Sequence, residues 1–220
     1  MSRTQAAVFT IALVLILDQV LKIYVKTHIH YGDGFSLLGL EWARIHFVEN
    51  EGMAFGISIG GKIGKYILSI FRIVTVSVLV YILRNMIKTK ESIGLIIFFS
   101  MVIAGAIGNI IDSMFYGMIF SESYFHGPIA TLFPPEGGYG SFLTGKVVDM
   151  LYFPLYDGPL PAWVPFIGGK PFEFFKHVFN IADASISIGV VCILLFHRSI
   201  LKNNKKEQTP ESLQPIQDED

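Results

Sequence analysis

The sequence predicts a membrane all-α bundle of four transmembrane helices with a small outer β-sheet and an amphipathic lip. Of the 220 residues, 52% are hydrophobic and only 16% are charged, whereas soluble proteins carry roughly a quarter charged residues. The mean hydropathy is +0.53. Four apolar stretches each approach the ~20 residues that a helix needs to cross ~30 Å of hydrocarbon. They cover residues 6–25, 66–83, 93–111 and 178–196.

Residues 1–201 are expected to form a single polytopic membrane domain, and residues 202–220 a polar cytoplasmic tail. Positive charge favours the cytoplasmic side, and the connection after the second stretch contains Arg84, Lys88 and Lys90. Further basic residues follow the fourth stretch. Both termini are therefore expected in the cytoplasm. The formal net charge of −1 gives no reason to expect a nucleic-acid partner.

Two segments predicted to face outward are more apolar than ordinary loops. Residues 40–59 alternate apolar and polar positions before a Gly-rich turn, which indicates short strands at the membrane surface. Residues 150–168 are apolar but contain four prolines, which makes a membrane span unfavourable. Their Trp, Tyr and Phe content is typical of a lip at the lipid headgroups.

Ionisable groups near hydrocarbon cost at least ~2.5 kcal/mol at a helix centre and are functional candidates for that reason. Asp183 is expected in the first turns of the fourth helix, with Asn180 as its N-cap. Asp183 could also simply complement the helix dipole. Asp149 is flanked by Val-Val and Met-Leu, so it is not an ordinary solvated acid.

Two carboxylates at one membrane boundary can share a proton, because neighbouring like charges do not both ionise cheaply. The protonated group can then polarise a carbonyl while the ionised group activates water. Asp149 and Asp183 are the candidate catalytic pair. The sequence by itself does not bring them together in space.

Other polar residues favour structural roles. Asp18 and Lys22 are four residues apart and can form an ion pair on one helix face. Gly105, Asn109 and Asp112 follow one face of the third helix, where the glycine permits close helix packing. The sequence contains no HExxH or GxSxG motif and one cysteine, and no metal site or cofactor is predicted.

Five short motifs, in order along the chain, resemble those of the bacterial lipoprotein signal peptidases, or signal peptidase II. They are Asp18-Gln19-Val20-Leu21-Lys22, Asn50-Glu51-Gly52-Met53-Ala54-Phe55-Gly56, Gly105-Ala106-Ile107-Gly108-Asn109-Ile110-Ile111-Asp112, Val147-Val148-Asp149 and Phe179-Asn180-Ile181-Ala182-Asp183. Each motif is short, but all five occur in the same order across the membrane portion.

This resemblance implies an aspartyl endopeptidase of the bacterial inner membrane, active near the outer face without a metal. It would remove signal peptides from prolipoproteins just before a diacylglyceryl-modified cysteine. Diacylated prolipoproteins and membrane lipid would be its partners, and globomycin-like peptides its inhibitors. Asp149 and Asp183 would be catalytic, whereas Asn50, Gly52, Asn109 and Asn180 would bind substrate or support the site. Asp18, Lys22, Gly105 and Asp112 would stabilise the structure.

The sequence departs from the family pattern at two places. The family usually has arginine directly after the third-motif aspartate, where this chain has Ser113. About thirty additional residues, an insertion at residues 117–146, separate the third motif from Asp149. The role of the insertion is not predicted.

A small membrane transporter or proton relay is the alternative, because it would also use buried Asp, Asn and Lys side chains. Transporters commonly contain paired repeats, and the sequence has none that we detect. A structural assembly factor would leave the cost of Asp149 and Asp183 unexplained. The peptidase interpretation is therefore preferred.

Overall fold

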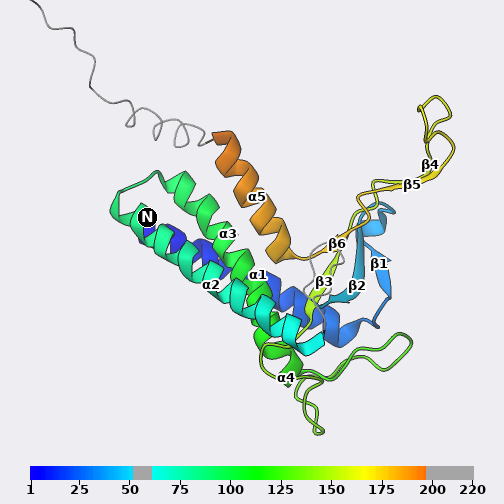
Figure 1. Ribbon diagram of the computed structural model, residues 1–220, viewed down its shortest axis with the longest axis horizontal. Helices are drawn as coiled ribbons and strands as arrows, with labels where there is room; N and C mark the ends of the chain where they lie inside the picture. The colour runs from blue at the N-terminus through cyan, green and yellow to red at the C-terminus, as the bar shows by residue number, and fades with distance from the viewer. Residues whose placement is uncertain (52–60, 197–220) are drawn as a thin grey trace, which may run out of the picture.

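The computed structural model describes residues 1–51 and 61–196. Three long helices lie side by side: α1 (Arg3–His28), α2 (Gly61–Lys88) and α3 (Ile93–Ile111) (Figure 1). Each is long and apolar enough to cross a membrane. Ser2 and Ser92 cap the first turns of α1 and α3 with their side chains. The first three predicted spans are confirmed as membrane-length apolar helices.

The third helix continues beyond its predicted end. A π-helical turn, η2 (Asp112–Tyr116), follows α3 directly and leads into the short α4 (Gly117–Ile119). Such turns widen the helix and change the direction in which side chains project. Asp112 and Ser113 are both buried within this turn. The helix therefore changes its geometry at the buried residues Asp112 and Ser113.

The fourth apolar stretch begins as a strand. Val178–Phe179 forms β6, and helix α5 (Ile181–Phe196) starts only after Asn180. The first two residues of the stretch therefore pair with another strand, and the helix begins directly after the predicted N-cap, Asn180. Helix α5 packs closely against α3, where a Cβ on Gly105 would collide with the carbonyl oxygen of Ala182. The predicted close approach at Gly105 is confirmed.

A four-stranded antiparallel sheet lies at one end of the helices (Figure 1). Its order is β1 (Gly34–Ser36), β2 (Arg44–Asn50), β3 (Val147–Tyr152), β6, and the 3₁₀ turn η1 (Leu37–Gly39) follows β1. Phe47 of β2 and Met150 of β3 are buried in a core shared with Val25 of α1 and Tyr116 of η2. The predicted short strands are confirmed within residues 40–50, whereas residues 52–59 lie outside the described part.

The predicted lip contains a β-hairpin arm. Strands β4 (Tyr156–Pro159) and β5 (Pro171–Phe174) pair with each other and extend away from the four-stranded sheet (Figure 1). Trp163 and Phe166 near its tip are 81% and 98% exposed. The first residues assigned to the lip, 150–152, belong to β3. An exposed aromatic arm of this kind suits the interfacial position predicted for the lip.

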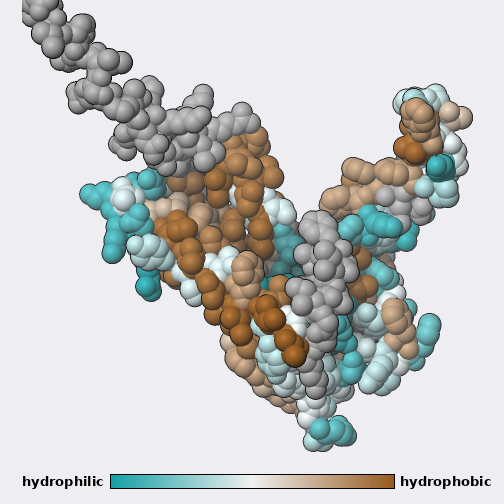
Figure 2. Space-filling model, in the orientation of Figure 1, coloured by the Kyte–Doolittle hydropathy of each residue, from teal (hydrophilic) through white to brown (hydrophobic). Residues whose placement is uncertain are grey.

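The insertion at 117–146 begins with α4 and continues as a loop. A single β-bridge joins Phe120 to Leu132. The Tyr139 hydroxyl accepts a hydrogen bond of 2.7 Å from the backbone amide of Lys146. Hydrophobic residues cover the visible sides of α2 and α5, whereas hydrophilic residues gather at the N-terminal end of the bundle and around the sheet (Figure 2). This division agrees with a membrane-embedded helical part.

Candidate active site

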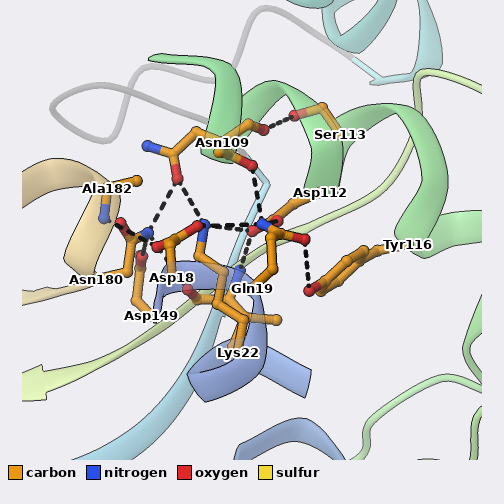
Figure 3. A network of polar contacts seen from close by, with 12 residues as sticks. Asp18, Gln19, Lys22, Asn109, Asp112, Ser113, Tyr116, Asp149, Asn180 and Ala182 are labelled. Carbon is orange, nitrogen blue, oxygen red and sulfur yellow. Dashed lines mark hydrogen bonds and ion pairs between the residues drawn. The ribbon is translucent and has the colours of Figure 1, made fainter. Parts of the chain in front are cut away.

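A buried polar network lies where α1, η2, β3 and the start of α5 meet, and Figure 3 shows its contacts. The candidate residues of the first, third, fourth and fifth motifs all reach this network. The sheet therefore brings Asp149 to the same end of the bundle as the residues on the helices.

Asp149 lies in the middle of β3 and is only 4% exposed. Its Oδ1 atom accepts a hydrogen bond of 2.7 Å from Asn180 Nδ2. Burial, reinforced by the neighbouring charge of Asp183, raises the pKa of Asp149 to about 7. This carboxyl is therefore poised to hold a proton near neutral pH.

Asp183 lies in the first turn of α5 and is partly exposed. Its Oδ1 atom accepts a hydrogen bond of 2.8 Å from Asn109 Nδ2 of α3. Its backbone N–H donates to Asn180 Oδ1 at 2.9 Å, which confirms Asn180 as the N-cap. In return, the Asn180 N–H donates to Asp183 Oδ2 at 3.4 Å, giving a reciprocal capping arrangement.

Asn180 connects the two acids. Its side-chain amide donates to Asp149 and also to Asn109 Oδ1 at 3.1 Å, while its oxygen caps the turn that holds Asp183. Asn180 is fully buried. The side chain therefore fixes a β3 carboxylate relative to an α5 carboxylate, although the two lie in different elements.

Lys22 forms the centre of the supporting network. Its ammonium lies 2.9 Å from Asp18 Oδ2 and 2.8 Å from Asp112 Oδ2, and it donates to Asn109 Oδ1 at 2.9 Å. Asp18 Oδ1 also accepts the N–H of Ala182 at 2.9 Å, in the first turn of α5. The predicted ion pair is thus present, and it joins α1, α3 and α5.

Two further residues of this network were not among the predicted site residues. Gln19 Nε2 donates to Asp112 Oδ1 at 3.0 Å, and Tyr116 donates to Gln19 Oε1 at 3.2 Å. Asp112 also accepts the Val148 N–H at 3.3 Å, which attaches β3 to η2. Gln19 follows Asp18 in the first motif, so its polarity within an apolar helix was the available signal.

Arg72, which lies within the second apolar stretch of the sequence, also reaches the site. Its Nη1 atom donates to Ser113 Oγ at 3.1 Å, and Ser113 Oγ donates to the Asn109 carbonyl at 3.0 Å. The guanidinium is also close enough for electrostatic attraction to Asp183, Asp112 and Asp149. The Arg72 guanidinium therefore contacts Ser113, the residue that stands where the family usually has arginine.

The second motif is described only in part. Asn50 is the last residue of β2 and pairs with Val147, two residues before Asp149 on β3. Gly52 lies outside the described residues. The sheet register thus places the start of this motif beside the strand that carries Asp149.

Comparison with known proteins decides the family. Residues 10–198 match the family model described as Signal peptidase (SPase) II. The chain belongs to the signal peptidase II family. The lipoprotein signal peptidase of Porphyromonas gingivalis is 48% identical over 95% of this chain and 92% of that protein. The lipoprotein signal peptidase of Amoebophilus asiaticus is 37% identical over 86% of this chain and 76% of that protein. The predicted family is therefore confirmed.

The fold agrees with this membership. A solved bacterial membrane enzyme, determined by the in meso method at 2.3 Å resolution, aligns over 94% of both chains with a TM-score of 0.58 and 25% identity. A second solved bacterial membrane enzyme aligns with a TM-score of 0.55 and 26% identity. Signal peptidase II enzymes are proteases, and nothing in these comparisons supports the alternative of a transporter or proton relay.

Proposed function

We propose that this signal peptidase II is an aspartyl endopeptidase in which Asp149 and Asp183 form the catalytic pair. The observation that supports it most directly is the Asn180 side chain, which binds the Asp149 carboxylate and caps the turn of Asp183. The raised pKa of Asp149, about 7, supplies an acid beside a second carboxyl group. This arrangement has both components of general acid–base hydrolysis.

In the proposed reaction Asp149 is protonated and Asp183 is ionised. A water molecule attacks the scissile carbonyl carbon and gives one proton to Asp183, while Asp149 gives its proton to the carbonyl oxygen. The tetrahedral intermediate then collapses. The C–N bond breaks, and the nitrogen receives the proton held by Asp183 while a hydroxyl proton of the intermediate returns to Asp149. The pair thus ends with the same single proton with which it began.

The substrates are proposed to be diacylated prolipoproteins, which are cleaved just before the lipid-modified cysteine. The P. gingivalis and A. asiaticus relatives are named lipoprotein signal peptidases. The apolar helices would place the acyl chains in lipid beside the site, and globomycin-like peptides would compete with substrate. Asn109 and Asn180 support the acids, and Asn50 and Gly52 are assigned to substrate binding on the family resemblance.

We further propose that α5 is the fourth span of an inner-membrane protein with both termini in the cytoplasm. Val191, Leu194 and Phe196 expose apolar side chains along α5. Arg3 donates to the Glu91 carbonyl at 2.7 Å, which brings the N-terminus to the basic α2–α3 connection. The polar network lies by the sheet, and by the positive-inside rule this end faces outward. Residues 1–201 would then form one domain, followed by the tail.

Cleavage of a diacylated lipobox peptide tests the catalytic pair. Asp149→Asn and Asp183→Asn should each reduce the rate by at least about 1,000-fold, because each removes a group needed for proton transfer. Asp33→Asn is the matched control, since Asp33 is an exposed acid outside the network. Helical circular dichroism and detergent size-exclusion chromatography should show folded protein for all three. Substantial cleavage by either site variant would contradict the proposal.

Cysteine labelling tests the topology. With Cys192 replaced by alanine, a membrane-impermeant maleimide should label Trp163→Cys in intact spheroplasts and Lys88→Cys only after lysis. Trp163 lies in the exposed arm, whereas Lys88 ends α2 at the opposite end of the bundle. The reverse labelling pattern would overturn the proposed orientation.

A further inference from the structure

Arg72 is a charged residue in the apolar helix α2, where its neighbours face outward. Ile70, Phe71 and Val74 expose 54%, 65% and 56% of their surface, whereas Arg72 is half-buried. A cation within a transmembrane helix is costly unless it faces the bundle and meets partners there. Arg72 therefore points away from the apolar face of α2 and requires a functional or structural partner.

The inward face of α2 attaches this helix to the site. Tyr66 and Ser69 precede Arg72 at three-residue spacing, on the same face of the helix. The Tyr66 hydroxyl lies 3.2 Å from Ser141 Oγ, and Ser69 Oγ donates to the Leu143 carbonyl at 3.0 Å. These contacts hold α2 against the end of the insertion. Arg72 follows Ser69 by three residues on the same face, and it reaches η2 through its hydrogen bond to Ser113.

The bond between Arg72 and Ser113 continues into the acid pair. Ser113 Oγ donates to the carbonyl of Asn109, and the Asn109 side chain donates to Asp183. The guanidinium is therefore connected to a proposed catalytic acid through two residues of one helix turn. An arginine in this place can influence both the position and the charge of that acid.

The charge balance of the site shows what Arg72 would supply. Lys22 is shared by Asp18 and Asp112, so its positive charge is already engaged by two carboxyl groups. Within residues 1–51 and 61–196, no ion pair joins a cation directly to Asp149 or Asp183. Arg72 is attracted electrostatically to Asp183 first, and then to Asp112 and Asp149. It adds a second positive charge to the site, beside η2.

We propose that Arg72 is a positioning residue of the peptidase site, which holds Ser113 in η2 and keeps one carboxylate of the Asp149–Asp183 pair ionised. The inference rests on the proposed function. The charged groups around this guanidinium are Asp183 on α5, Asp112 in η2 and Asp149 on β3. Lys22 on α1, which is paired with Asp18, also acts on Asp149. Arg72 is the contribution of α2 to the site.

The rate of lipobox peptide cleavage, measured against pH, tests the role of Arg72. Arg72→Met should lower kcat about 10- to 100-fold with KM changed less than about 3-fold, because it alters the acids and not the peptide contacts. Without the cation the ionised carboxylate is less stable, so it takes a proton at higher pH. The acidic limb of the profile should therefore move upward by about one pH unit.

Three further variants separate charge from packing. Arg72→Lys keeps the charge and should keep the acidic limb near its wild-type position, although its rate is lower. Ser113→Ala removes the hydrogen bond and should also leave the limb in place. Arg84→Met, an exposed arginine on the same helix, is the matched control and should match the wild type. A wild-type profile for Arg72→Met, or an equal shift in Arg72→Lys, would overturn the inference.

A double variant covers the case in which Arg72→Met does not fold. Arg72→Met with Ser113→Arg supplies a guanidinium from η2, at the position where the family usually has arginine, and it should recover folding and the wild-type acidic limb. A folded double variant with a shifted limb would contradict the charge role. If Asp149→Asn is inactive while Arg72→Met behaves as wild type, only this inference fails. If Asp149→Asn retains cleavage, the proposed function itself fails.

Discussion

Lys22 and Lys26 lie one turn apart on α1 and are both fully buried, yet they stabilise different parts of the molecule. Lys22 lies between the Asp18 and Asp112 carboxylates in the candidate active site. Lys26 pairs with Glu49 of β2 and donates to Ser123 of the insertion at 2.9 Å. Lys22 thus supports the candidate site, whereas Lys26, one turn later on the same helix, fixes the insertion.

The surroundings of the two lysines differ in kind. Lys22 is neutralised by two carboxylates and an amide oxygen, so its loss would leave two buried charges without a cation. Lys26 has one carboxylate partner and lies 5.2–5.9 Å from the ring centres of Phe47, Phe120 and Tyr139. Glu49 also has Lys146 at 4.0 Å. The insertion is therefore anchored by a partly aromatic site, which tolerates loss of charge better than the Lys22 network does.

Replacing Lys22 should have the largest effect on stability. Lys22→Met leaves Asp18 and Asp112 buried without their shared cation, so we expect unfolding to become easier by about 3–5 kcal/mol. Activity should fall with it, because Asn109 and Ala182 lose their fixed positions. Thermal unfolding in detergent measures the change. A variant as stable as the wild type would contradict the central role of Lys22.

Proton linkage should distinguish the site from the anchor of the insertion. The pKa of Asp149 is raised to about 7 in the folded protein, against about 3.9 in an unfolded chain. The folded state therefore holds a proton that the unfolded state has lost, and stability falls as pH rises from about 4 to about 7. Relative to Asp149→Asn, the wild type should lose up to about 4 kcal/mol across this range.

Denaturant unfolding at several pH values measures this linkage. Lys26→Met should retain the wild-type slope with pH, because Asp149 is unchanged in that variant. The cleavage rate should also fall as pH rises through about 7, since the proposed acid then loses its proton. Parallel stability curves for wild type and Asp149→Asn would show that Asp149 does not titrate in this range.

Loss of Lys26 should be milder than loss of Lys22. Lys26→Met leaves Glu49 with Ser123 and the more distant Lys146, and we expect unfolding to become easier by about 1–3 kcal/mol. The rate per folded molecule should stay within about 3-fold of the wild type. Titration of the active sites with a tight-binding inhibitor gives the concentration of folded enzyme. The maximal rate divided by that concentration is the rate per folded molecule. Loss of catalysis in a folded variant would show that the insertion supports the site directly.

The outer ion pair of the insertion should matter least. Lys146 lies 2.9 Å from Glu122, and its hydrogen bond and positive charge lower the pKa of Glu122. This pair is partly exposed. Glu122→Gln should change stability by less than about 1 kcal/mol, because exposed pairs contribute little. Raising the salt concentration should change the stability of the wild type by a similarly small amount. A larger loss would show that this surface pair, and not Lys26, holds the insertion.

The sequence predicted the membrane helices better than the sheet. Continuous apolar runs identify α1, α2 and α3, because a run of about 20 apolar residues is typical of a transmembrane helix. The strand β3 was not predicted, since Val147-Val148-Asp149 looks equally like the end of a loop. The strand β6 was not predicted either, because Val178 and Phe179 suit a helix in lipid as well as a strand, although Asn180 was predicted as the N-cap of the helix that follows.

Within the site, local spacing carried more information than long-range contact. The ion pair of Asp18 and Lys22 follows from helical geometry. The approach of Asp149 to Asp183 depends on β3 pairing with β6, in the register that places Leu151 opposite Phe179. That register is not encoded in either motif by itself. Arg72 was visible as a charge in an apolar run, but its partner Ser113 lies on another helix.

The hydrogen bond from the Ala182 amide to Asp18 has a consequence for biosynthesis. These two residues are separated by 164 positions, so a nascent chain inserted only as far as α3 has the carboxylate but not the amide that it receives. Asp149 would then be without the Asn180 side chain that orients it. The proposed catalytic pair would therefore be assembled only after α5, the last helix to be synthesised, has packed against α1 and α3.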